Sequence, residues 1–367
     1  MPIHQKRSFF KQERTLLMLS ALALPLLVMV DQELHSAVEN ESNRPVQTPQ
    51  RSTRTALHKS IEEGRIAEAL RLIKSGAAVN VQDSFGLTPI HFAVIKDDLL
   101  LIKELLAHKA DTNARDRRGD TPLHMVAANN GSLSLAQMLL QAGANPNSAN
   151  SDGSTPLHWA SGEGNLSLVK LLLEKGAKIN ARDLKGDTVL HWAVEEGRFP
   201  VAEYLLTSGA DANAKNHYHR TPLHWAARKG HGSLAEFLLA KGAVADARAT
   251  AGDTPLHWAA AEGHLALVTL LAKQSPNLDI KAQFGETPLH WAVLRGHDTV
   301  VAYLVEQGAD VNIADEMGNT PRTLARDKGN EGIVKLLNLR ETLHSAKALH
   351  KPGMPIRVAL ANESDPH

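Results

Sequence analysis

The chain has 367 residues, and its 40 Lys and Arg balance 40 Asp and Glu, so that the formal net charge is zero. This balance argues against a general attraction to nucleic acid or to an anionic membrane, and we expect no nucleic-acid partner. The sequence has no cysteine, which excludes disulfides, cysteine-ligated zinc and a thiol nucleophile.

The first 30 residues have the composition of an export signal. Four basic residues between positions 6 and 14 precede residues 16–30, LLMLSALALPLLVMV, which carry no charge. A basic segment followed by an apolar run of about 7–15 residues is typical of a signal peptide, whereas a membrane span needs about 20 residues. Residues 1–30 are therefore predicted to be either a cleaved signal peptide or an uncleaved signal anchor. The protein would then be periplasmic or extracellular in the first case, and anchored in the inner membrane in the second.

Residues 31–50 are expected to be a disordered linker. They are mostly polar and contain Pro45 and Pro49. Such a segment cannot bury enough apolar surface to offset the entropy lost on ordering. It would join the N-terminal segment to the body of the protein.

A repeat dominates the sequence from residue 51 to residue 338. Threonines recur at a spacing of 33 residues, with one interval of 34, at Thr55, Thr88, Thr121, Thr155, Thr188, Thr221, Thr254, Thr287 and Thr320. A fixed period near 33 residues indicates an architecture of stacked units, each of which buries its apolar face only against its neighbours.

The fourth unit illustrates how each repeat is expected to fold. Thr155 is a favourable N-cap, and Pro156 fits the first helical position, where its missing N–H costs nothing. Gly164 should end this first helix, and the apolar spacing from Leu166 predicts a second one. Gly176 would end the second helix before a loop leads to the next threonine.

These motifs resemble the ankyrin repeat family. The sequence TPLH occurs at Thr121, Thr155, Thr221, Thr254 and Thr287, and TALH, TPIH and TVLH occur at Thr55, Thr88 and Thr188. The resemblance implies an all-α repeat solenoid of nine stacked helix-turn-helix units with β-hairpin loops. The ninth unit departs from the pattern, because Arg322, Thr323 and Arg326 are polar where core residues are expected. It is predicted to be a terminal cap, and residues 339–367 a short helical extension with a flexible tail.

Eight histidines occupy the third position after the threonine. They are His58, His91, His124, His158, His191, His224, His257 and His290. A metal array is rejected, because neighbouring repeats are about 8–10 Å apart whereas two imidazoles on one zinc need nitrogens within ~4 Å. One ring nitrogen can instead meet the N-cap threonine and the other a loop carbonyl of the next repeat, a bridging role that the ankyrin resemblance implies. No metal or other cofactor is expected.

All five tryptophans share the next position. They are Trp159, Trp192, Trp225, Trp258 and Trp291. On a helical wheel this position lies opposite Leu157, which points to the inner, concave side of the solenoid. Two interpretations remain open: a ladder packed between neighbouring first helices, and a partly exposed aromatic floor that binds a partner.

Charged residues at the ends of the first helices and in one loop are the other candidate binding residues. Glu163, Glu195 and Glu196 form an acidic zone, which is followed by a basic zone of Arg220, Arg228 and Lys229 with Tyr218. Adjacent zones of opposite sign favour a bipolar protein partner over a polyanion. A solvated face of no significance is the alternative, because scattered surface charges are normal.

The sequence contains no P-loop, no GxSxG, no HExxH and no GxGxxG that opens a βαβ unit, and no catalytic residue is assigned. We therefore expect a monomeric, non-catalytic scaffold, exported or membrane-tethered through residues 16–30. It would bind a partner protein of unknown identity through the concave groove and the hairpin tips. The alternative is a secreted, effector-like protein that acts on a target in a host or neighbouring cell.

Overall fold

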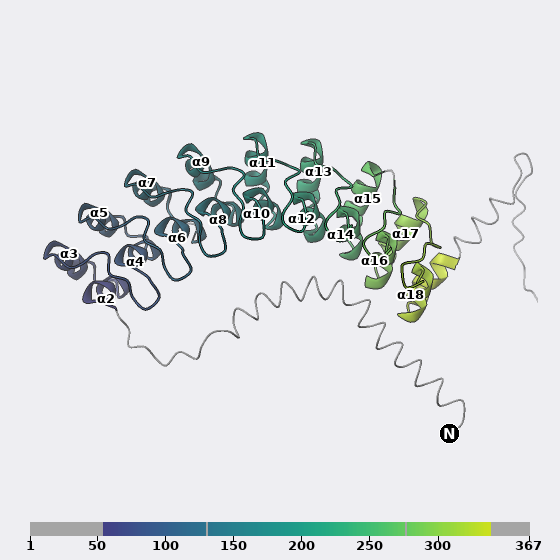
Figure 1. The fold of residues 1–367 in the computed structure, drawn as a ribbon, viewed down its shortest axis with the longest axis horizontal. Coiled ribbons are helices and arrows are strands. Elements are labelled where there is room, and N and C mark those ends of the chain that lie inside the picture. Colours follow the sequence, from purple (N-terminus) through teal and green to yellow (C-terminus); the bar gives the residue numbers. More distant parts are fainter. Residues whose placement is uncertain (1–53, 130, 276, 339–367) are drawn as a thin grey trace, which may run out of the picture. The chain divides into compact units, whose positions relative to one another are not determined.

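The structure is a computed structural model that describes residues 54–338 except residues 130 and 276. The predicted export signal, the linker and the tail lie outside the described residues. The described part is a stack of helix pairs, coloured from purple to yellow in Figure 1. Taken by itself, this stack is curved, with one row of helices along its inner side and a second row along its outer side.

The inner row consists of the first helix of every repeat. These helices are α2 (Ala56–Glu62), α4 (Pro89–Ile95), α6 (Pro122–Ala128), α8 (Pro156–Glu163), α10 (Val189–Glu195), α12 (Pro222–Lys229), α14 (Pro255–Ala261), α16 (Pro288–Arg295) and α18 (Pro321–Asp327).

The outer row consists of the second helices. They are α3 (Ile66–Lys74), α5 (Leu99–Ala107), α7 (Leu133–Gln141), α9 (Leu166–Glu174), α11 (Phe199–Thr207), α13 (Gly232–Ala240), α15 (Leu265–Gln274) and α17 (Asp298–Glu306). In the ninth repeat a helix begins at residue 331 and is described to residue 338. This all-α arrangement confirms the predicted stacked fold.

The local sequence explains where the first helices begin and end. In α8, Thr155 has an extended backbone and serves as the N-cap, and Pro156 follows at the start of the helix. Gly164 ends α8 with a φ of +82°, which is in the left-handed region that glycine adopts without strain. Leu157, Ala160, Leu168 and Leu172 of this repeat are fully buried, because they lie on the faces that the two helices turn toward each other and toward neighbouring repeats.

The histidines join each repeat to the next. In the first eight repeats the backbone N–H of the N-cap threonine lies 3.0–3.2 Å from Nδ1 of the histidine three residues later. An N–H can only donate, so Nδ1 is the acceptor and the ring proton is on Nε2. This Nε2–H donates to a loop carbonyl of the following repeat, at 3.0–3.5 Å, in seven of the eight histidines. The exception among the described residues is His91, whose buried Nε2 has no hydrogen-bond partner.

A second set of histidines caps the first helices from the other side. Nε2 of His231, His264 and His297 lies 3.1, 3.2 and 2.8 Å from a carbonyl near the end of the preceding repeat's first helix. These carbonyls have no partner within their own helix. The second set therefore adds a bond between the ends of α10, α12 and α14 and the repeat that follows each of them.

Asparagines make a further connection between repeats where the loops begin. The Asn147 side chain donates to the Gly176 carbonyl at 2.9 Å and accepts from the Lys178 N–H at 2.9 Å. Asn113 and Asn213 make the same pair of bonds to the repeats that follow them. The amide side chain is suited to this position because it both donates and accepts.

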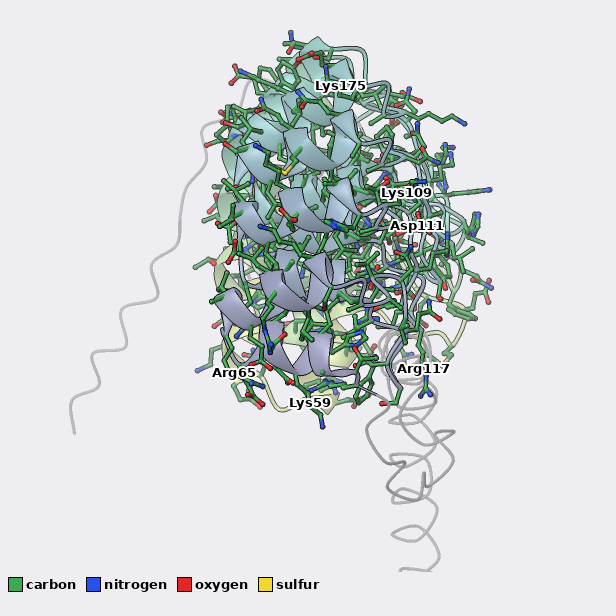
Figure 2. The ribbon with its side chains drawn as sticks, turned by 90° about the vertical axis from the view of Figure 1, so that its left-hand side faces the viewer. Lys59, Arg65, Lys109, Asp111, Arg117 and Lys175 are labelled. Atoms are coloured by element: carbon green, nitrogen blue, oxygen red, sulfur yellow. The ribbon has the colours of Figure 1, made fainter. Side chains whose placement is uncertain are left out.

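The loops lie together on one side of the stack. Figure 2, which views it from the first repeat, shows Lys109, Asp111 and Arg117 on the loop side and the helices on the other. Each loop closes in a tight turn, as where the Asp183 N–H donates to the Asp187 carbonyl at 3.0 Å. The expected β-hairpins are reduced to these turns, since the described residues contain a single isolated bridge, between Arg182 and Thr188.

Two departures from the repeat pattern have local consequences. Ser275, at the end of α15, has an extended backbone (φ −107°), and Ser275 and Pro276 stand where most repeats have a Gly-Ala pair. Asp97 and Lys109 stand where other repeats have glycine and are held at φ values of +52° and +65°. Side chains with a Cβ are strained in this region.

We predict that Lys109→Gly stabilises the protein, because it removes this strain. The expected gain is about 0.5–1 kcal/mol after the greater entropy of glycine in the unfolded chain is subtracted. Lys175→Gly is the matched control, since Lys175 ends α9 with an ordinary φ of −87° and should lose stability. Urea unfolding followed by circular dichroism measures both, and a Lys109→Gly protein no more stable than the parent contradicts the prediction.

The buried histidines predict a loss of stability in mild acid. Burial lowers the pKa of His191 to about 4 and those of His224 and His257 to about 3. Between these values and the ordinary pKa near 6.5, only the unfolded chain binds the protons, so stability falls as pH falls below 6.5. From pH 7.5 to pH 5.5 these three histidines should together lower the free energy of unfolding by about 4 kcal/mol.

Four carboxyls whose pKa is raised by burial, Asp187, Asp253, Asp279 and Glu286, oppose this trend. Burial raises the pKa of Asp187 to about 6. Its protonation in the folded protein therefore raises the free energy of unfolding by about 1 kcal/mol over the same pH range. Urea unfolding at the two pH values should still show a clear net loss, and His257→Gln should reduce it. Equal stability at both pH values would contradict the neutral, bridging state of the histidines.

Candidate functional site

The five tryptophans lie in one row along the first helices, but their exposure differs. Trp225, Trp258 and Trp291 are only 6 %, 5 % and 7 % exposed, whereas Trp159 and Trp192 are half-buried. Neighbouring indoles meet edge to face, with ring centroids 5.5 Å apart for Trp159 and Trp192 and 5.6 Å apart for Trp258 and Trp291. The exposed-floor interpretation therefore does not describe the last three tryptophans, and their role in binding a partner stays a prediction.

Glycine and aspartate residues shape the places where the indoles pack. A Cβ added to Gly162 would lie 3.3 Å from the Trp192 ring, so the absence of a side chain there makes room for the indole of the next repeat. The Trp192 N–H donates to Asp183 at 3.0 Å, and the Trp258 N–H donates to Asp253 at 2.6 Å. Trp192 and Trp258 are thus fastened to the loops, whereas the buried N–H groups of Trp159 and Trp225 have no hydrogen-bond partner within the described part of the chain.

Two arginines of repeat six pack against the indoles of this row. The Arg228 guanidinium lies 5.3 Å from the Trp225 ring and 5.2 Å from the Trp258 ring. Arg220 lies 5.1 Å from the Trp258 ring and 5.4 Å from Tyr218 at the loop tip. A guanidinium stacks through its faces, and its N–H donors lie in its plane.

The structure corrects the prediction that Arg220 is a surface residue of the basic zone. Arg220 is only 6 % exposed, because Tyr218 and the indoles of two repeats cover it. Arg228 is half-buried and Lys229 is exposed. Of the three predicted basic residues, Arg228 and Lys229 can contact a partner directly. Arg220 is instead buried and packs against the Tyr218 ring.

The acidic and basic zones are in contact. Lys229 Nζ lies 3.4 Å from Glu195 Oε1, so part of each zone is neutralised by the other. The side chains are 42 % and 33 % exposed, and an ion pair this open to water contributes little to stability. Glu163 and Glu196 remain exposed beside it.

The loop tips carry a row of exposed apolar side chains. Five of them stand out by exposure: Phe85 (58 %), Leu184 (67 %), Tyr218 (44 %), Phe284 (38 %) and Met317 (44 %). Backbone hydrogen bonds link one tip to the next, such as the His217 N–H to the Lys185 carbonyl at 2.9 Å and the Thr250 N–H to the Tyr218 carbonyl at 2.8 Å. The row is therefore fixed on a hydrogen-bonded ridge rather than carried by independent loops.

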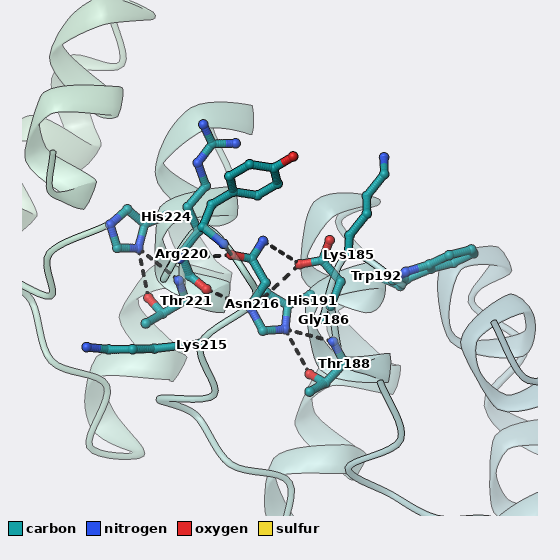
Figure 3. A network of polar contacts seen from close by, with 12 residues as sticks. Lys185, Gly186, Thr188, His191, Trp192, Lys215, Asn216, Arg220, Thr221 and His224 are labelled. Carbon is teal, nitrogen blue, oxygen red and sulfur yellow. Dashed lines mark hydrogen bonds and ion pairs between the residues drawn. The ribbon is translucent and has the colours of Figure 1, made fainter. Parts of the chain in front are cut away.

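The loop at Tyr218 shows how a tip is held (Figure 3). The Asn216 side chain accepts from the N–H groups of Tyr218 and Arg220, both at 3.0 Å, and donates to Asp187 at 2.9 Å. His219 follows with a φ of +57°, at a position where the other described loops have glycine. The exposed Tyr218 thus sits on a tightly bonded and locally strained turn.

Two buried carboxyls lie beneath this loop. Burial raises the pKa of Asp187 to about 6, although the hydrogen bond from Asn216 acts in the opposite direction. Burial likewise raises the pKa of Asp253, against the hydrogen bond from Trp258. Both side chains are buried, and one oxygen of each accepts a hydrogen bond within the protein, Asp187 Oδ1 from Asn216 and Asp253 Oδ2 from Trp258, so they position the loops rather than face a partner.

Both ring nitrogens of His158 and His191 are taken up by hydrogen bonds, so these rings are structural. Among the residues that the structure describes, no group of three or more potential metal ligands is found. What the surface offers is fixed apolar tips beside charged groups.

The stacking of Arg228 between two indoles and the strained backbone of His219 were not predicted from the sequence. A signal for the first was present, because Arg228 follows Trp225 by three residues and lies on the same helical face. A signal for the second was the replacement of a loop glycine by histidine. Both positions are peculiar to repeat six.

We predict that Trp258→Ala mainly affects folding. It removes a buried ring that contacts Trp291 and Arg228 and should lower the free energy of unfolding by about 3 kcal/mol. Tyr218→Ala, at an exposed tip, should cost less than about 1 kcal/mol. Urea unfolding compares the two, and equal losses would contradict the assignment of Trp258 to the packed row.

Comparison with known proteins agrees with this geometry. The pattern described as Ankyrin repeats (3 copies) matches residues 57–150, 124–216, 209–283 and 270–344. A search of curated proteins found no match. In the described part of the chain no helix is both long and apolar enough to span a membrane. The matched ranges together extend from residue 57 to residue 344, and the chain therefore belongs to the ankyrin repeat family.

Proposed function

We propose that this protein is a non-catalytic scaffold that binds a partner protein through its loop tips and the adjoining ends of its first helices. Ankyrin repeat proteins are typically scaffolds for protein–protein interaction. The observation that carries the proposal is the row of exposed apolar tips, from Phe85 to Met317, fixed on a hydrogen-bonded ridge. Aromatic residues and methionine are enriched where proteins meet.

The rigidity of this surface supports binding. The tips are already positioned by bonds such as those of Asn216, so association would order few new groups. Tyr218, Arg228 and Lys229 would contact the partner, together with Glu195 and Glu196 at the next helix end. The buried Arg220 and the packed tryptophans would contribute by holding these residues in place.

We further propose that the protein is exported, with residues 1–30 as the signal or anchor. The basic lead and the uncharged run of residues 16–30 support this assignment. The partner would then be met in the periplasm, at the outer face of the inner membrane, or outside the cell.

A photo-crosslinking amino acid at Tyr218 in the full-length protein tests both proposals in producing cells. A matched control carries it at Lys103 on α5, an exposed position on the outer row. We expect a protein adduct from Tyr218, recovered in the envelope or the medium, and none from Lys103. Adducts from Lys103 alone would contradict the proposed binding face, and adducts confined to the cytoplasm would contradict export.

A further inference from the structure

The charge of the loops changes sign along the ridge. Loops 175–188 and 208–221 contain six Lys and Arg and three Asp, a formal charge of +3. Loop 241–254 is neutral, with two residues of each sign. Loops 275–287 and 307–320 contain one Lys and five Asp and Glu, a formal charge of −4.

Not all of these charges reach the surface, since Asp187 and Arg220 of the positive loops and Glu286 and Asp315 of the negative loops are buried. Four basic residues of the middle loops that we single out, Lys178, Arg182, Lys185 and Lys215, are exposed, as are Asp310 and Glu316 at the other end. Arg182 donates a hydrogen bond to the Lys215 carbonyl at 2.7 Å. This bond keeps the Arg182 guanidinium on the ridge, next to the following loop. Among the described residues, neither Lys185 nor Lys215 forms an ion pair with a carboxylate.

Exposed apolar tips lie on these charged loops, and two of them, Tyr218 and Phe284, flank the neutral loop in the middle. Leu184 and Tyr218 stand on the positive loops, and Phe284 and Met317 stand on the negative ones. Neighbouring repeats are about 10 Å apart, so the four steps from Leu184 to Met317 cover about 40 Å. An extended chain of about 12 residues has this length.

From this arrangement we infer the chemistry of the partner, an inference that rests on the proposed function. We propose that the ridge from repeat five to repeat nine binds an extended polypeptide segment that is acidic at one end, apolar in the middle and basic at the other. The acidic end lies over Lys185 and Lys215, and the basic end over Asp310 and Glu316. Opposite charges at the two ends fix the direction in which the segment binds, because reversing it places like charges together.

Three fluorescent peptides of about 15 residues and identical composition test this inference. One has an acidic, an apolar and a basic block in that order, one has the blocks reversed, and one is scrambled. Binding to the full-length protein is measured by fluorescence anisotropy. One of the two block orders should bind about tenfold more tightly than the other two peptides, and about 0.5 M salt should reduce this preference.

Charge-reversal variants locate the site. Lys185→Glu combined with Lys215→Glu should weaken binding of the preferred peptide about tenfold. The matched control combines Lys103→Glu with Lys273→Glu, which makes the same change of charge at exposed positions on α5 and α15 and should leave binding unchanged. Circular dichroism of each variant verifies that it is folded.

Several outcomes would overturn the inference. They are equal binding of block and scrambled peptides, absence of binding, equal effects of the two double variants, and tighter binding of an acidic oligonucleotide than of any peptide. If these occur while Tyr218 still crosslinks to a protein, the proposed function stands and only the bipolar segment is wrong. If the crosslink is also absent, the proposed binding face fails as well.

Discussion

The structure depends on one hydrogen-bonded unit, the N-cap threonine with the histidine three residues later. Because the threonine N–H occupies Nδ1, the ring must carry its proton on Nε2 and present it to the next repeat. The same side chain therefore starts a helix and fixes the distance to its neighbour. It works only while it is neutral, and its burial keeps its pKa low. Backbone hydrogen bonds join neighbouring loop tips, so the distance between repeats also sets the distance between the tips.

Much of the fold could be predicted from the sequence because its signals are local. Thr155, Pro156 and Gly164 each have a conformational preference that acts within one helix, and these preferences recur at a fixed interval. The family comparison over residues 57–344 agrees with the predicted repeat region. The two hydrogen bonds of His158 could also be predicted from the sequence, because they join positions that recur in every repeat unit: the N-cap threonine and a loop residue of the next repeat.

The candidate site was harder to predict, because its features arise between repeats. Arg220 was expected at the surface as a charged residue next to a turn, yet rings from two repeats cover it. The burial of Trp258 likewise depends on Trp291 and on the two arginines, none of which a helical wheel of one repeat includes. The helical wheel gave the correct row for the tryptophans, but not how much of each indole remains exposed.

The described hydrogen bonds between repeats mostly join neighbours, as the clamp of Asn147 on Gly176 and Lys178 illustrates. The stack therefore does not depend on contacts between residues near its two ends. A lineage could therefore gain or lose a whole 33-residue unit without redesigning the units that remain. Such a change would move the far loops outward or inward by one step and rotate them about the axis of the stack. The length of the ridge is in this sense a quantity that evolution can adjust separately from its chemistry.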